Sequence, residues 1–124
     1  MKTTYTVYVF EGRIRRSDYR ENYDVLMLDD TCLSKAFAEA LGNERRQVSV
    51  RYFISSEPMT EEERTHAEVM IAIGEGYAEY VERYSFTTGY LWTDEELTVG
   101  GHDLETEIGS YVGSWCRLEL MIHV

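Results

Sequence analysis

The residues best suited to chemistry are His102 and Asp103, which directly follow a pair of glycines. Glycine adopts backbone conformations that are closed to other residues, and a histidine at a helix start can act as a general base or bind an anion. In a structural interpretation, the glycines form a tight turn and Asp103 caps the helix that follows. The pattern favours this structural role and leaves open a small enzyme that uses His102 and Asp103, with His66 as a further candidate.

His66 belongs to a different pattern, because it follows Glu62 and Glu63 at helical spacing. A carboxylate and an imidazole on one helix face could bind a metal, but a structural zinc site needs four ligands and a catalytic one needs three. None of the three histidines lies at ligand spacing from another. We therefore predict no metal and no cofactor, and we interpret this helix face as solvated. The common motifs of nucleotide-binding proteins, zinc proteases and serine hydrolases are also missing.

Acidic residues supply the candidate binding surface. One run of acids falls in residues 93–96, which we expect to form an acidic turn or a single helical turn, and another falls in the first turn of a helix that begins near residue 60. Such runs are usually solvated faces, which is the alternative interpretation. The candidate binding residues are Asp94, Glu95, Glu96, Glu61, Glu62, Glu63 and the neighbouring Trp92.

The charge of the chain is uneven, although its net value is −11. Residues 1–51 carry nine basic and eight acidic side chains, a net of +1, whereas residues 52–124 carry three arginines and 15 acids, a net of −12. A negative field of this size repels nucleic-acid phosphates and attracts cationic surfaces. The same surplus also favours solubility, which is the alternative explanation for it.

Charge and composition together predict a small binding protein that engages a basic protein surface, for example that of a nucleic-acid-binding protein, without contacting nucleic acid or membrane itself. The ten tyrosines fit this class, because tyrosine is enriched at protein interfaces. Two other classes stay open. One is the enzyme described above, and the other is a structural homo-oligomer in which the arginine-rich segment 13–20 of one copy meets the acidic half of another.

A chain of 124 residues with 44% hydrophobic residues is expected to form a single domain, residues 1–124, around one core. Its apolar runs fall far short of the roughly 20 residues that span a membrane. Its first residues also lack the apolar centre of a signal peptide. We interpret Cys32 and Cys116 as reduced thiols, which predicts a cytoplasmic protein.

Alternation of apolar and polar residues predicts most of the strands. The last segment alternates over its whole length and has one uniformly apolar face, so we expect it to lie near the centre of the sheet. A turn or bulge is expected at Glu11 and Gly12, and a loop over residues 17–22. Strands are expected over residues 3–10, 13–16, 23–28, 47–55, 77–86 and 114–124, with short ones near 90–92 and 97–99.

Three helices are predicted from apolar residues at helical spacing and from capping residues. The first covers residues 32–41, is capped by Asp30 or Thr31 and ends at Gly42. The second covers residues 60–73 and begins with a capping box, and the third begins at Asp103 and continues to about residue 111. Because the strands alternate, we predict an α+β fold. It is a single two-layer domain with a mainly antiparallel or mixed sheet of about five strands and two to three helices.

One segment carries a resemblance to known proteins. Residues 89–104, GYLWTDEELTVGGHDL, resemble a segment of small acidic proteins carried by prophages and other mobile elements. The resemblance implies no catalytic residue. It implies a context, because small acidic proteins of mobile elements often act by binding and blocking a host factor, sometimes as mimics of DNA charge. By this analogy the chain is expected to be an inhibitor of such a factor.

Overall fold

The computed structural model describes residues 4–17 and 25–123. Its strands form one eight-stranded sheet in the order β3-β2-β1-β8-β4-β5-β6-β7, and every neighbouring pair is antiparallel. The strands are β1 (Tyr5–Ser17), β2 (Val25–Leu28), β3 (Thr31–Cys32), β4 (Arg46–Ser55), β5 (Met70–Tyr84), β6 (Leu91–Val99), β7 (His102–Asp103) and β8 (Trp115–His123). The helices are α1 (Leu33–Leu41), α2 (Glu61–His66) and α3 (Leu104–Gly109).

The predicted α+β class is confirmed, but the sheet has eight strands where about five were expected. The difference arises mainly at the sheet edges, where β3 and β7 are two-residue strands that no alternation pattern could reveal. The loop expected over residues 17–22 lies almost entirely outside the described residues.

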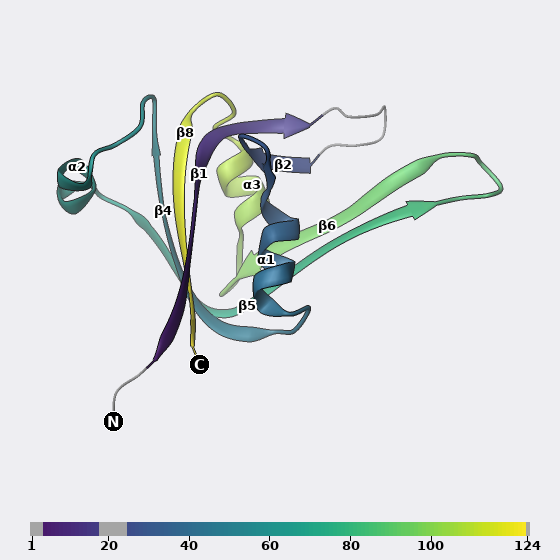
Figure 1. Cartoon of the computed structure of the whole chain (residues 1–124), viewed down its shortest axis with the longest axis horizontal. Coiled ribbons are helices and arrows are strands. Elements are labelled where there is room, and N and C mark those ends of the chain that lie inside the picture. The colour runs from purple at the N-terminus through teal and green to yellow at the C-terminus, as the bar shows by residue number, and fades with distance from the viewer. Residues whose placement is uncertain (1–3, 18–24, 124) are drawn as a thin grey trace.

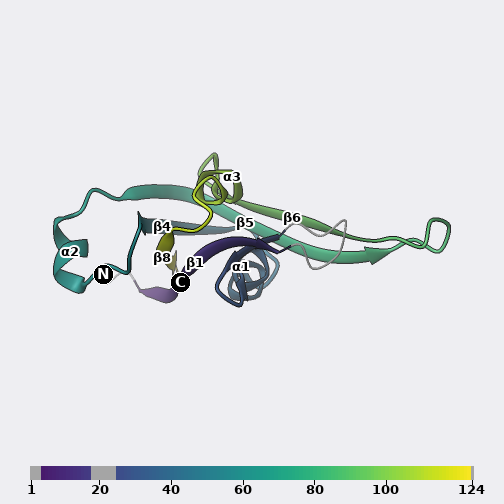
Figure 2. The same cartoon turned by 90° about the horizontal axis from the view of Figure 1, so that it is seen from above.

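Strand β8 organises the sheet, because it pairs with β1 on one side and with β4 on the other. Its alternation is confirmed, since the face that carries Cys116, Leu118 and Leu120 is fully buried. We call this the inner face of the sheet. Helices α1 and α3 pack against it and share its core, to which α1 contributes Phe37 and α3 contributes Ile108. Figures 1 and 2 show how the sheet curves around these two helices.

Strand β1 corrects the predicted turn at Glu11 and Gly12, because the chain runs through both residues as one strand. Its first part pairs with β8 and its last part pairs with β2, and the strand bends between the two (Figure 1). Gly12 is needed where β1 passes close to the turn after β2. A Cβ atom on Gly12 would lie 2.8 Å from the backbone nitrogen of Asp29.

Helix α2 is shorter than predicted, because it ends at His66 and the strand β5 begins at Met70. The apolar residues after His66 suit a helix face by spacing, but they pair with β4 and extend the sheet. Alternation shows this clearly, since Ala72 is buried while its neighbours Ile71 and Ile73 are exposed. Tertiary pairing therefore outweighs the local helical pattern in this segment.

Of the caps predicted for α1 and α2, two are confirmed and one is wrong. Thr60 and Glu63 form the predicted capping box at the start of α2. Gly42 ends α1 in the left-handed conformation with φ of 67°, as expected. The start of α1 differs, because Cys32 holds the N-cap position without a side-chain hydrogen bond, in place of Asp30 or Thr31.

Strands β5 and β6 form a long hairpin whose far end projects beyond the rest of the molecule (Figures 1 and 2). We call residues 79–96, the outer part of this hairpin, the arm. The pairing extends from Gly76 opposite Val99 to Tyr84 opposite Leu91. The arm corrects the acidic turn predicted at residues 93–96, because these residues lie inside β6 and are paired with β5.

Candidate functional site

His102 contacts a glutamate that sequence analysis did not select. Its Nδ1 atom lies 2.7 Å from Oε1 of Glu107, which projects from the first turn of α3. The other carboxylate oxygen, Oε2, accepts a hydrogen bond of 3.2 Å from the hydroxyl of Tyr52 on β4. Three elements therefore hold this carboxylate in place. The only sign of the His102–Glu107 pair in the sequence was the spacing of five residues between them.

Asp103 has the structural role that the sequence allowed. Its carboxylate accepts hydrogen bonds from the backbone N–H and the hydroxyl of Thr106, at 3.4 and 2.9 Å. The preceding turn depends on Gly100, whose φ is 55° and whose Cα lies against Gly74. A Cβ atom on Gly74 would lie 2.8 Å from that Cα. The two glycines thus set the entry to α3, and Asp103 caps it.

The His102–Glu107 pair can orient an imidazole, as the carboxylate does in a catalytic triad. Within residues 4–17 and 25–123, however, no hydroxyl or thiol forms a hydrogen bond with His102, and no three His, Cys, Asp or Glu side chains are placed to hold a metal. His66 lies on α2, a different element from the His102 turn. The described residues therefore present an oriented histidine without a nucleophile beside it.

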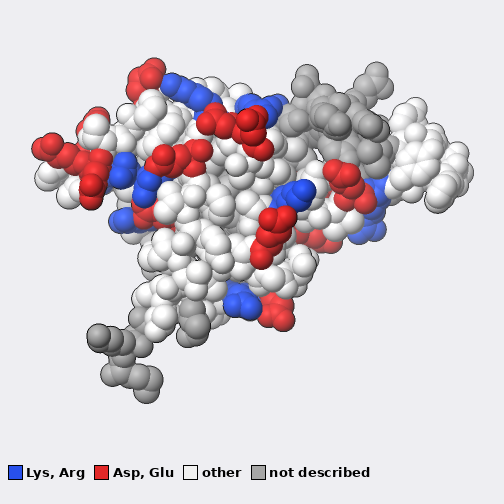
Figure 3. Space-filling model, in the orientation of Figure 1, with Lys and Arg blue, Asp and Glu red and all other residues white. Residues whose placement is uncertain are grey.

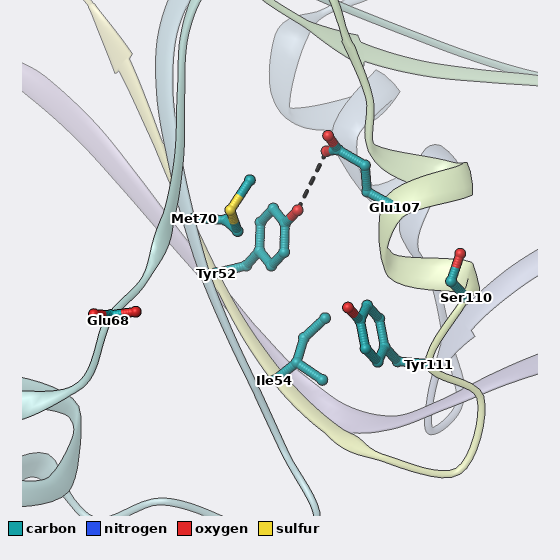
Figure 4. Close-up of a pocket in the computed structure, with 7 residues that line it drawn as sticks. All are labelled: Tyr52, Ile54, Glu68, Met70, Glu107, Ser110 and Tyr111. Atoms are coloured by element: carbon teal, nitrogen blue, oxygen red, sulfur yellow. Dashed lines mark hydrogen bonds between the residues drawn. The ribbon is translucent and has the colours of Figure 1, made fainter.

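A cavity of about 430 Å³ opens between β4 and α3, next to this carboxylate. Figure 4 shows Tyr52 and Tyr111 projecting into the space from opposite sides, with Glu107 above the Tyr52 hydroxyl. Burial, reinforced by the charge of Glu107, raises the pKa of Tyr52 well above its ordinary value. The Tyr52 hydroxyl therefore stays protonated and continues to donate to Glu107.

The acids predicted on residues 94–96 divide between the two faces of β6. Glu95 points to the inner face and its side chain is only 7% exposed, whereas Asp94 and Glu96 are exposed. Asp94 is paired with Arg83 across the hairpin, at 2.9 Å. Trp92 lies in β6 by its backbone, and its side chain is outside the described residues. Glu95 therefore cannot meet a partner's surface in this conformation, while Asp94 and Glu96 can.

Glu95 belongs to a buried cluster with Arg16 and Glu105. The Ser34 hydroxyl donates a hydrogen bond of 2.8 Å to it, and the Arg16 guanidinium lies 3.4 Å from Glu95 and 2.8 Å from Glu105. Burial, with a smaller contribution from the neighbouring Glu105, raises the pKa of Glu95 to about 7, although Ser34 and Arg16 act to lower it. One arginine is thus shared between two carboxylates on the inner face.

The outer face of the sheet holds a second cluster. Glu119 on β8 is bonded by Arg51 on β4 and by Arg117 on its own strand, and Arg117 also pairs with Glu11 on β1. Burial disfavours the charge of Glu119, but the hydrogen bonds from Arg117 and Arg51 outweigh it and lower the pKa. The alternation of β8 predicted its apolar face, but it gave no sign that Glu119 on the opposite face makes these contacts.

The acids of α2 lie at one end of the molecule, where Figure 3 shows acidic side chains gathered over that helix. Glu61, Glu62 and Glu63 are all exposed. Hydrogen bonds from the Thr60 backbone and side chain lower the pKa of Glu63, as its capping role requires. Glu61 and Glu62 therefore remain available to a partner.

Arginines of the first half neutralise acids of the second half within the same molecule. Arg13 pairs with Glu57, Arg45 with Glu75, and Arg16 with the two glutamates of the inner cluster. These arginines are therefore already paired within one molecule, and the homo-oligomer in which the segment 13–20 meets the acidic half of another copy stays an untested prediction. The negative charge that is not neutralised in this way lies on the acids that have no arginine nearby.

The arm carries exposed aromatic side chains that sequence analysis did not select. Phe86 is 95% exposed, Tyr84 is 55% exposed and packs edge-on against it, and Tyr90 is 58% exposed. In Figure 3 the end of the arm forms an uncharged tip. We call these three residues the aromatic tip. Alternation predicted the strands around it, but gave no sign that the hairpin extends past the core.

No family model, curated protein or solved structure matches this chain. Among the described residues, no helix is long and apolar enough to cross a membrane.

Proposed function

We propose that this protein is a non-enzymatic binding protein that engages a basic protein surface through its arm. The observation that carries the proposal is the aromatic tip, which projects from the body and exposes Phe86 almost completely. A large apolar side chain gains nothing from such exposure in the free protein. Its burial in a partner would contribute roughly 2 kcal/mol, and aromatic anchors of this kind dominate many interfaces.

The charges along the arm support a basic partner. Glu79, Glu82 and Glu96 lie behind the aromatic tip and form no ion pair with any described arginine, lysine or histidine, whereas Asp94 is paired. The exposed acids of α2 add a second negative surface at the opposite end of the molecule. Uncompensated surface charges of this kind raise the association rate with a cationic partner at low salt.

The resemblance of residues 89–104 to proteins of mobile elements supports a narrower form of the proposal. In that form the partner is a nucleic-acid-binding protein of the host, and this chain blocks it as a mimic of DNA charge. The segment covers all of β6 and the turn to α3, so it includes part of the arm. The free thiols of Cys32 and Cys116 support a reducing compartment, and we propose the cytoplasm.

The test places a photo-crosslinking amino acid at position 86 and repeats the experiment at position 112. Val112 is also exposed, but it lies next to α3 on the body. Ultraviolet irradiation in host lysate should capture one protein from position 86 and not from position 112. The captured protein should have an isoelectric point above about 9.

The affinity should then be measured with the purified partner. Phe86→Ser should weaken binding by about tenfold or more, since a central aromatic anchor contributes 2 kcal/mol or more. Glu79→Lys with Glu82→Lys should slow association and flatten its salt dependence. Glu39→Lys, an exposed acid on α1, is the matched control and should have little effect.

The proposal predicts no tight binding to duplex DNA at moderate salt. Direct DNA binding would refute the role of charge. An association rate that depends neither on ionic strength nor on the charge reversal at Glu79 and Glu82 would refute it as well. Capture from position 112 in place of 86 would refute the role of the aromatic tip.

A further inference from the structure

The cavity between β4 and α3 has a composition that selects for positive charge. Its described lining includes the carboxylates of Glu68 and Glu107 and no lysine, arginine or histidine. An anionic ligand would meet two like charges there without a counterion. A neutral ligand would displace water from these carboxylates without supplying a positive charge in return, which is costly.

The carboxylate of Glu107 is held in a fixed orientation, because Tyr52 donates to one oxygen and His102 contacts the other. Each oxygen keeps a second lone pair, so the group can still accept hydrogen bonds. A fixed carboxylate at the wall of a cavity loses little entropy when it binds a cation. It differs in this respect from Glu61 and Glu62 of α2, which are exposed.

The remaining walls suit a flat cation on an aliphatic chain. The rings of Tyr52 and Tyr111 border the cavity, and aromatic faces attract guanidinium groups both by stacking and by cation–π interaction. Ile54 and Met70 provide apolar surface for methylene groups. The volume of about 430 Å³ lies at the lower end of the range for ligand pockets and exceeds what one such side chain needs.

We propose that this cavity binds an alkyl guanidinium group, with the cation against Glu107 and its stem against Ile54 and Met70, while Glu68 lies on the other side of the cavity (Figure 4). The group can come from an arginine side chain of a protein partner or from a free small guanidine. The first source rests on the proposed binding function, and the second does not. The cavity lies in the body and its lining includes no residue of the arm.

The test titrates the isolated protein with three probes and follows backbone amide signals by two-dimensional NMR. The probes are agmatine, N-acetyl-arginine methylamide and N-acetyl-citrulline methylamide. Citrulline has the shape of arginine without its charge, so it is the matched control. We expect the two guanidinium probes to shift the signals of Tyr52, Glu107 and Tyr111 with a Kd on the order of 1 mM or tighter, and the citrulline probe to leave them unchanged.

Variants then assign the contact. Glu107→Gln should weaken guanidinium binding by about tenfold, and Glu68→Gln should weaken it by a smaller factor, because its charge acts from the other side of the cavity. Glu62→Gln, which removes an exposed acid of α2, should leave it unchanged. Glu68 is exposed and lies outside the helices and strands, so Glu68→Gln keeps the test valid if Glu107→Gln disturbs α3.

Each outcome has a distinct meaning. Tighter binding of the arginine derivative than of agmatine supports a protein source, and the reverse supports a free guanidine. Equal binding of the citrulline probe, shifts outside the cavity, or equal weakening by Glu62→Gln would overturn the proposal. Because no partner is present in the titration, failure here leaves the crosslinking result at the aromatic tip unaffected, and failure there leaves this site unaffected.

Discussion

The two faces of the sheet each bury one glutamate, and the pKa values of these two carboxylates are shifted in opposite directions. On the outer face Glu119 is bonded by two arginines, and its pKa is lowered. On the inner face Glu95 shares one arginine with Glu105, and its pKa is raised to about 7. Both are almost fully buried, so burial alone does not decide the direction.

The difference shows that the ratio of cations to carboxylates controls whether a buried acid stays charged. Two arginines, one of which also pairs with the exposed Glu11, overcome the desolvation cost of Glu119. One arginine divided between two carboxylates does not overcome it for Glu95, so a proton replaces the missing cation. The outer cluster should therefore stabilise the protein at neutral pH, whereas the inner cluster should do so at acidic pH.

The largest expected effect on stability comes from truncating apolar side chains, and it should differ between the two faces. Leu118→Ala removes a fully buried side chain from the inner face and should cost about 2–5 kcal/mol of unfolding free energy. Met121→Ala, on the outer face of the same strand, should cost less than half as much, because Met121 is only partly buried. Urea unfolding measures both. Equal losses would show that the two faces are packed equally well.

The next effect is at Glu119. Glu119→Gln removes the charge that both arginines bond and should cost about 2 kcal/mol at pH 7. Because the folded pKa of Glu119 is lowered from 4.5, this stabilisation is present above about pH 4.5 and is lost as pH falls through the folded pKa. Urea unfolding at pH 7 and pH 3 should show the difference between variant and wild type shrinking. A difference that stays constant with pH would contradict the charged cluster.

At Glu95 the sign is reversed. The folded pKa of about 7 exceeds the unfolded value of 4.5, so the folded protein binds more protons between these values and loses stability as pH rises through them. Glu95→Gln removes this loss and should be more stable than wild type by on the order of 1 kcal/mol at pH 8, with the gain vanishing near pH 4.5. Thermal unfolding across this range measures it. A variant that is less stable than wild type at pH 8 would show that Glu95 is ionised and well paired.

The smallest effect concerns the helix that supplies Glu105 to the inner cluster. Asp103→Ala removes the cap of α3 and should cost about 1 kcal/mol. His102→Ala is the control from the adjacent position and should change stability little, because its ring is 38% exposed. Unfolding curves of both variants measure these two changes in stability. A larger loss of stability for His102→Ala than for Asp103→Ala would show that the His102–Glu107 pair contributes more to stability than the cap does.

Sequence patterns correctly predicted the elements that depend on interactions between residues close together in the chain. The alternation of β8, the apolar stripe of α1 and the Thr60–Glu63 capping box were all visible in the sequence, because each depends on spacing of a few residues. The helix expected up to residue 73 failed where the strand β5 gains a partner in β4. That pairing is non-local, and spacing does not reveal it.

The candidate sites were predicted less well, for a similar reason. Glu95 looked like part of a solvated acidic turn, and only the fold brings Arg16, 79 residues away in sequence, against it. Glu107 was invisible as a partner of Tyr52, which is 55 residues distant. Asp103 was recognised as a cap because its partner, Thr106, is three residues away. Contacts between distant segments therefore decide which acids are available to a ligand.

The central position of β8 also has a consequence for synthesis on the ribosome. Strands β1 and β4 both hydrogen-bond to residues 115–123, so each lacks this neighbour until the last of the described strands has emerged. Until then the nascent chain presents two open edges, one of which contains the apolar run from Val7 to Phe10. We expect the sheet to close late, and we expect the yield of native protein to depend on chaperones that shield those edges during translation.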